Sequence, residues 1–162
     1  MGYSGWIIVA KGDDTLSKES AVVAHGSAIL AEYVRGDWRE LWLNDRWGAR
    51  PSPSVAEVVA TTSAPAMAIY VRDEDCAVAY GATPSGRRWE GVFSEEAAAA
   101  YEVTPAHYQR ARAVVGALAW AKEAGLTCCE PEPVETALRD GWYSDLLQRF
   151  GLPEGVEVHR AG

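Results

Sequence analysis

The sequence predicts an α+β fold, in which a mixed but mostly antiparallel sheet is covered by C-terminal helices. Two observations support this fold class. Short bulky segments separated by turn residues occur as far as residue 93, and helical patterns follow from residue 94 onward. With 162 residues, 48% of them hydrophobic and 23% charged, the chain is expected to form one domain over residues 1–153, followed by a flexible tail over residues 154–162.

The first elements are expected to be a buried strand and a hairpin. The first bulky, β-branched segment ends at Gly12-Asp13-Asp14, and Arg35-Gly36-Asp37 joins two further apolar segments as a short turn. Residues 17–26 could begin a helix at Ser17 or form a loop, and the sequence leaves both open. The strands predicted here are 6–10, 28–34 and 38–43.

The middle of the chain predicts a helix and a three-stranded meander. A serine can cap a helix over residues 54–62, which ends before Ala64-Pro65. Two turns, Asp73-Glu74-Asp75 and Thr83-Pro84-Ser85-Gly86, then separate three strands. These strands are predicted over 66–71, 76–82 and 88–93.

An internal similarity indicates a possible duplication. Tyr33-Val34-Arg35-Gly36-Asp37 resembles Tyr70-Val71-Arg72-Asp73-Glu74, and each segment closes a strand and enters an acidic turn. Because a helix follows each group of strands, the chain could consist of two related β-β-β-α halves.

The C-terminal part is expected to be helical. Ser94 is predicted to cap an alanine-rich helix, and Thr104-Pro105 to open a long helix that ends at Gly125-Leu126. The long helix carries apolar residues on two faces and is expected to be buried on both sides. A last helical region is predicted over 133–150, with a possible break at Gly141.

Composition limits the classes of partner. The net charge of −8 disfavours a nucleic-acid partner, and the densest basic cluster, Arg87-Arg88, is too small to follow a phosphate backbone. The apolar runs are too short to span a bilayer and the N-terminus lacks the basic segment of a signal peptide, so no membrane association is expected. Three cysteines, two of them adjacent at Cys128-Cys129, form a poor disulfide framework and favour a cytoplasmic location.

Motifs with a known catalytic mechanism are missing. The sequence contains no P-loop, GxGxxG, HExxH or GxSxG motif and no zinc-ligand spacing, so catalytic residues stay unknown and no metal or cofactor is expected. His25 is expected at a surface position, and His107 in the first turn of the long helix. Asp73-Glu74-Asp75 precedes Cys76, but a solvated turn followed by a core cysteine explains this cluster without a metal.

Two sets of residues are candidates for binding. Trp47 lies between Arg46 and Arg50 in the polar segment 44–53, and these three are predicted to bind a partner because Trp and Arg on a loop are typical of interface hot spots. The alternative set would line an aromatic pocket between the sheet and the helices. It consists of Trp38, Trp42, Tyr70, Asp75 and Tyr80.

Several framework segments carry a resemblance to known proteins. They are Ala64-Pro65-Ala66, Asp75-Cys76-Ala77-Val78, Thr83-Pro84-Ser85-Gly86-Arg87-Arg88-Trp89 and Ala119-Trp120-Ala121-Lys122-Glu123-Ala124-Gly125-Leu126. Together they resemble a group of small actinobacterial α+β proteins with no assigned function, over roughly residues 54–152. The resemblance implies a shared framework and no particular activity.

These observations favour a cytoplasmic, acidic, non-catalytic binding protein that acts through a protein partner, as an immunity or accessory factor does. The missing catalytic motifs, the acidic balance and the Trp/Arg segment support this interpretation. The alternative is a small-molecule enzyme or ligand carrier that uses the aromatic pocket.

Overall fold

The computed structural model describes residues 2–12, 29–44, 55–127 and 130–158, and these residues contain one seven-stranded sheet. Its strands are β1 (Gly5–Lys11), β2 (Ile29–Arg35), β3 (Trp38–Asn44), β4 (Ala66–Arg72), β5 (Cys76–Ala82), β6 (Arg88–Phe93) and β7 (Val156–Glu157). They lie in the order β6-β5-β4-β1-β3-β2-β7, and every neighbouring pair is antiparallel. The predicted α+β class is confirmed, with an entirely antiparallel sheet in place of a mixed one.

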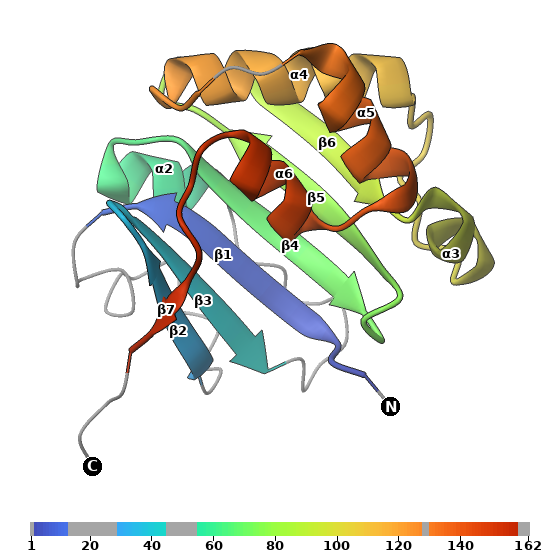
Figure 1. The fold of residues 1–162 in the computed structure, drawn as a ribbon, viewed down its shortest axis with the longest axis horizontal. Helices are drawn as coiled ribbons and strands as arrows, with labels where there is room; N and C mark the ends of the chain where they lie inside the picture. Colours follow the sequence, from blue (N-terminus) through green and yellow to red (C-terminus); the bar gives the residue numbers. More distant parts are fainter. Residues whose placement is uncertain (1, 13–28, 45–54, 128–129, 159–162) are drawn as a thin grey trace.

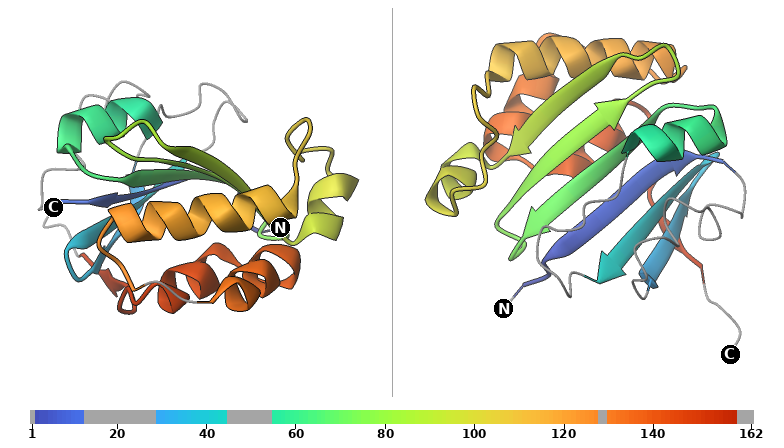
Figure 2. Two further views of the ribbon diagram at one scale, coloured as in Figure 1. Left: turned by 90° about the horizontal axis from the view of Figure 1, so that it is seen from above. Right: turned by 180° about the vertical axis from the view of Figure 1, so that it is seen from behind.

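Helices cover both faces of this sheet (Figure 1). They are α2 (Val55–Thr62), α3 (Glu95–Ala100), α4 (Arg110–Glu123), α5 (Pro131–Asp140) and α6 (Tyr143–Arg149). Helices α4, α5 and α6 lie on one face, which we call the helical face, and α2 lies on the other, the α2 face, as Figure 2 shows. Helix α3 packs beside β5 and β6. The sheet is therefore the middle of three layers.

Strand β1 shows how the two faces are filled. Ile7 and Val9 join the apolar cluster beneath the C-terminal helices, whereas Trp6, Ile8 and Ala10 join the cluster beneath α2. All five side chains are buried. Because both of its faces are covered, β1 has a continuously apolar sequence instead of an alternating one.

Most turns and caps lie where the sequence predicts them. The β5–β6 turn is closed by the Gly86 N–H, which donates to the Thr83 carbonyl at 3.0 Å. Helix α4 ends at the predicted glycine: Gly125 has φ +74°, and the Leu126 N–H donates to the Ala121 carbonyl at 2.9 Å. These features are local in sequence, which is why the pattern alone predicts them.

Helix α4 begins later than predicted. It starts at Arg110 instead of Thr104-Pro105, because the preceding segment turns along the edge of β6. His107 has φ 61°, which does not fit a helix, and the Tyr108 hydroxyl accepts the Val92 N–H at 3.2 Å. The prediction that His107 lies in the first helical turn is therefore wrong.

Helix α4 is buried on one of its two predicted faces and only partly buried on the other. Ala113, Ala117 and Trp120 are buried, whereas Val115 is 68% exposed. On the predicted second face Val114 is buried and Leu118 is half-buried, whereas Ala111 and Val115 are exposed. The prediction therefore holds only in part, because Val115 lies at the rim beside β6.

Ser94 does not cap α3 with its side chain. The residue has φ 61°, and its hydroxyl donates to the Gly141 carbonyl at 3.2 Å. This bond links the start of α3 to the break between α5 and α6. The break itself lies at Gly141, as predicted.

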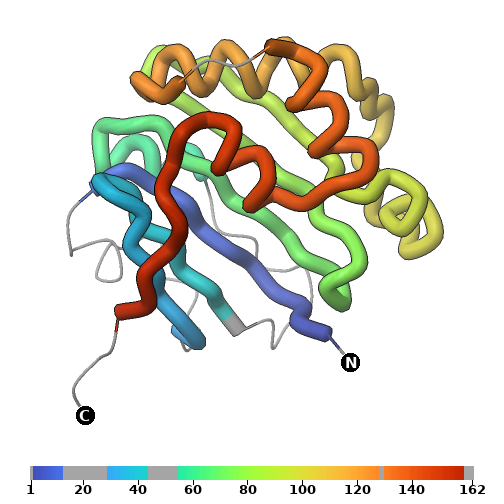
Figure 3. Tube along the Cα trace, viewed as in Figure 1, coloured from blue at the N-terminus to red at the C-terminus, as the bar shows by residue number. Residues whose placement is uncertain are grey.

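The expected flexible tail over residues 154–162 includes a short strand. Val156–Glu157 pairs as β7 with Tyr33 and Val34 of β2, and Figure 3 traces the chain from α6 along this side of the sheet. The expectation of a frayed tail is corrected for these two residues. The outer edge of β2 offers backbone hydrogen-bonding groups, and β7 pairs with them.

The strand order gives no support to a duplication. In the first half β1 pairs with β3, the third strand, whereas in the second half β4 pairs with β5, the second strand of its group. A repeated β-β-β-α unit would keep the same internal pairing.

Trp120 joins α4 to the end of the sheet. Its indole N–H donates to the carbonyl oxygens of Ala66 at 3.1 Å and Ala82 at 3.0 Å. Its ring packs against Trp38, with ring centroids 5.6 Å apart, and against Phe150 at 6.4 Å. One side chain therefore connects α4, three strands and the end of α6.

A buried carboxylate holds the opposite side of the helical face. Glu40 is 2% exposed, and it accepts hydrogen bonds from Arg35 at 2.8 Å, from the Trp42 indole at 2.6 Å and from the Tyr143 hydroxyl at 3.2 Å. Burial and the charge of Glu40 raise the pKa of Tyr143 above its ordinary value, so its hydroxyl stays a donor. Arg35 also donates to the Pro153 carbonyl.

We expect Glu40→Ala to lower the free energy of unfolding by about 3–5 kcal/mol, because it leaves a guanidinium and two other donors without their acceptor. Urea denaturation measures this loss. Glu90→Ala is the matched control, since Glu90 is exposed, and it should change stability by less than about 0.5 kcal/mol. Equal losses in both variants would contradict this role of Glu40.

Candidate binding groove along the β6 edge

None of the three residues predicted to bind a partner lies among the described residues. Arg46, Trp47 and Arg50 lie outside the described residues. Their role stays a prediction.

The five residues of the predicted aromatic pocket do not share one cavity. Trp38 and Trp42 belong to the helical face, whereas Tyr70 and Tyr80 belong to the α2 face. Asp75 lies in the β4–β5 turn and accepts the Tyr101 hydroxyl at 2.6 Å. The prediction fails because side chains alternate along each strand, so the register separates the four aromatic residues into two layers.

The outer edge of β6 leaves backbone groups unpaired. Val92 directs its N–H away from β5, to the Tyr108 hydroxyl, and an antiparallel strand repeats this orientation at every second residue. Arg88 and Glu90 therefore direct both their N–H and their C=O outward, and among the described residues nothing pairs with these groups. This part of the edge can accept another strand.

A groove of about 480 Å³ lies beside this edge. One wall is the start of β6 and the other is the first half of α4 with the segment that leads into it. The residues that line it are Arg87, Arg88, Trp89, Glu90, Ala106, His107, Tyr108, Gln109, Arg112, Ala113, Val115 and Gly116. The floor is apolar and the rim is charged.

Three arginines make the groove basic within an acidic chain. The Nε atom of Arg87 lies 4.0 Å from Oε1 of Glu123. Among the described residues, no acidic group lies within ion-pair distance of Arg88 or Arg112. Glu90 is the one acidic residue in the described lining. Two guanidinium groups without a described counter-ion therefore lie at the groove: Arg112 is on the α4 wall, and Arg88 is on the β6 edge with its side chain directed toward the α2 face.

Contacts with α3, α5 and β6 hold α4 in place, so the width of the groove is defined. At its start, Arg110 donates twice to Glu95 at 2.8 Å and once to Glu135 at 3.2 Å. In its middle, Gly116 lies directly against Trp89, where any added Cβ would overlap the Trp89 Cβ.

The end of α4 is fastened to the β5–β6 turn. The Ser85 hydroxyl donates to Glu123 at 2.5 Å and the Ser85 N–H donates to the same carboxylate at 3.3 Å. The hydrogen bond from Ser85 is the main reason that the pKa of Glu123 lies below its ordinary value.

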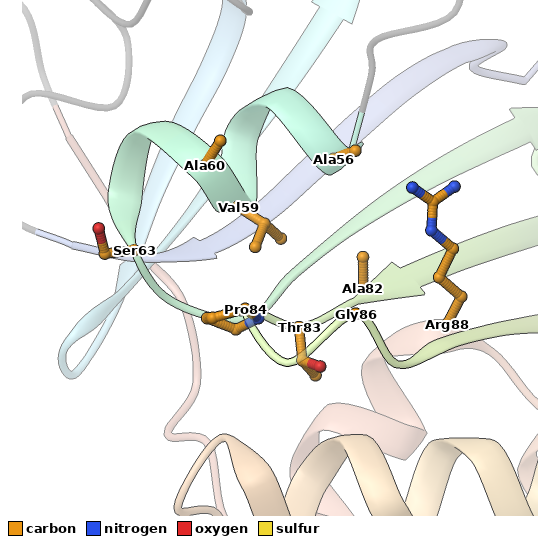
Figure 4. A pocket seen from close by; sticks show the side chains of 9 residues that line it. All are labelled: Ala56, Val59, Ala60, Ser63, Ala82, Thr83, Pro84, Gly86 and Arg88. Atoms are coloured by element: carbon orange, nitrogen blue, oxygen red, sulfur yellow. The ribbon is translucent and has the colours of Figure 1, made fainter.

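A second, smaller cleft of about 390 Å³ lies on the α2 face, between α2 and the β5–β6 turn (Figure 4). Ala56, Val59 and Ala60 form one side, and Ala82 lies at its base. Arg88 stands at the side of this cleft and also lines the groove.

Comparisons with known proteins give no indication of function. No family model, curated protein or solved structure matches the chain. The resemblance to small actinobacterial proteins stays a prediction.

The described residues also limit membrane and metal binding sites. None of the helices there is long and apolar enough to cross a membrane. No three His, Cys, Asp or Glu side chains among them gather in a way that could hold a metal ion.

The sequence contained one signal for this groove. Arg87-Arg88 is the densest basic cluster of the chain, although the pattern alone does not indicate a groove for a peptide. Arg112 and Val115 gave no signal, because their relation to β6 depends on how α4 packs.

We expect Gly116→Ala to lower the free energy of unfolding by about 1–3 kcal/mol, because the new methyl group overlaps Trp89. On an exposed helix the same change would raise stability by about 1 kcal/mol. The sign of the change in unfolding free energy, measured by urea titration, therefore distinguishes a packed Gly116 from an exposed one. Gly12→Ala is the control, since no atom lies within 4 Å of its added methyl group. A stabilised Gly116→Ala would show that α4 does not touch β6 here.

We expect Glu123→Gln to lower the melting temperature at neutral pH and to lose this effect in acid. The folded-state pKa of Glu123 lies below 4.5, so the ionised carboxylate contributes stability above that pH, and the contribution disappears as the pH falls through the lowered pKa. Thermal melts of both proteins between pH 7 and about pH 3 measure the difference, with Glu90→Gln as control. A difference that persists unchanged in acid would contradict this link.

Proposed function

We propose that this chain is a non-catalytic binding domain that takes an extended, acid-bearing segment of a partner protein as an added strand on β6. The observation that carries the proposal is the open edge at Arg88 and Glu90 beside a groove with unpaired guanidinium groups. Domains that bind peptides by strand addition derive affinity from main-chain hydrogen bonds and specificity from the pockets alongside.

The other sheet edge is a weaker candidate for strand addition. There, β7 pairs with β2, and the Val158 N–H donates to the Glu32 carbonyl at 2.8 Å. On β6, Tyr108 closes the edge at Val92 and leaves it open at Arg88 and Glu90. An antiparallel partner strand could form up to about four backbone hydrogen bonds with these two residues.

Charge indicates which segments fit. The chain as a whole carries −8, but Arg88 and Arg112 give the groove a local positive potential. A segment with one or two carboxylates gains from both guanidinium groups, and Val115 offers an apolar contact on the α4 wall. A cytoplasmic role as an immunity or accessory factor is compatible with such a groove and stays a prediction.

The alternative, an enzyme or ligand carrier with an aromatic pocket, has less support. Its residues are divided between the two faces of the sheet, and Trp38 is buried against Trp120. The smaller cleft on the α2 face has one charged residue, Arg88, and no aromatic wall.

The proposal is tested by selecting linear peptides from a random displayed library and measuring their Kd by fluorescence anisotropy. We expect Glu90→Pro to bind the selected peptides about 3–10-fold more weakly than Glu90→Ala, because only proline removes the outward N–H. This N–H is not part of the β5–β6 ladder, and proline is tolerated at such edge positions.

Amide hydrogen exchange of the unmodified protein gives a second readout. Bound peptide should slow exchange at the amides of Arg88 and Glu90. If no peptide is enriched, or if these amides exchange equally fast with and without the peptide, strand addition at β6 is wrong.

A further inference from the structure

We infer that the partner strand is recognised by charge at alternate positions: a basic residue opposite Glu90, an aliphatic residue opposite Trp89, and an acidic residue opposite Arg88. This inference rests on the proposed function and adds a sequence pattern to it. Read from the N-terminus, the pattern is Lys or Arg, then an aliphatic residue, then Asp or Glu, because an antiparallel partner meets Glu90 before Arg88.

The two charged side chains of the edge point to the same face. Arg88 and Glu90 are two residues apart on one strand, so both project toward the α2 face, and Figure 4 shows Arg88 extending to the level of α2. Trp89 projects to the helical face. A partner strand therefore alternates in the same way, with its first and third residues beside the two charges.

Neither charge is neutralised from within the sheet. The residue opposite Arg88 on β5 is Ala82, and the residue opposite Glu90 is Tyr80. Burial raises the pKa of Tyr80 and the nearby charge of Glu90 adds to this, so Tyr80 is a neutral neighbour. Both charges consequently have a free cross-strand position on the outer side, about 5 Å away in an antiparallel pair.

The middle position faces α4. There, Gly116 brings the helix close above Trp89, and Val115 is the exposed apolar residue beside it. The space suits a slender aliphatic side chain. A carboxylate further along the segment would reach Arg112 on the same wall.

The test compares two synthetic peptides that differ only in charge order, with Lys-Val-Glu or Glu-Val-Lys at their centre. We expect the protein to bind the first about tenfold more tightly, because two favourable cross-strand pairs replace two like-charge contacts. The double variant R88E/E90R should reverse this preference. The surface double variant R139D/D140R, which exchanges an exposed ion pair at 2.7 Å, should leave it unchanged.

The outcomes separate the inference from the proposed function. Equal affinity for both peptides, with exchange protection at Arg88 and Glu90, would overturn the charge pattern and keep strand addition. Failure of every selected and synthetic peptide to bind would overturn both. If R88E/E90R does not fold, the affinities of the unmodified protein for the two peptides still test the charge pattern.

Discussion

The groove depends on one contact, the close approach of α4 to β6. Gly116 permits it, because the helix backbone can lie directly on Trp89. Trp120, one turn further along, fixes the rotation of the helix by donating to two carbonyl oxygens at the end of the sheet. With the helix held in this rotation, Arg112 and Val115 lie at the rim instead of in the core. A helix placed over the middle of the sheet would have left no groove.

The two edges of the sheet are covered by different elements, and one of them stays partly open. Open edges invite aggregation, and proteins commonly protect them with charged residues or covering segments. Here β7 covers part of β2, and Tyr108 covers part of β6. Arg88 and Glu90 protect the remainder by their charges. Charges of opposite sign, two residues apart, exclude an apolar strand but admit one with the complementary order, so protection and recognition are compatible.

The sequence predicted the parts of the fold that are local. The meander, Gly125 and Gly141 depend on neighbouring residues, and each lies where its pattern indicates. The start of α4 was missed because Tyr108 bonds to Val92, 16 residues away. The aromatic pocket was wrong for a related reason, since register decides which residues of different strands share a face. Arg88 gave a sequence signal, but its partnership with Arg112 is visible only after packing.

Among the described residues, Arg88 and Arg112 have no acidic group within ion-pair distance, although the chain carries 23 acidic and 15 basic residues. Acidic residues are abundant, but Glu40 forms its ion pair with Arg35, and Glu95 forms its ion pair with Arg110. Leaving Arg88 and Arg112 without partners is thus a matter of placement and not of shortage. The surrounding negative charge repels long polyanions, whereas the local positive potential attracts a short carboxylate-bearing segment at close range. If β6 takes an added strand as we propose, this arrangement would favour a short carboxylate-bearing segment over nucleic acid.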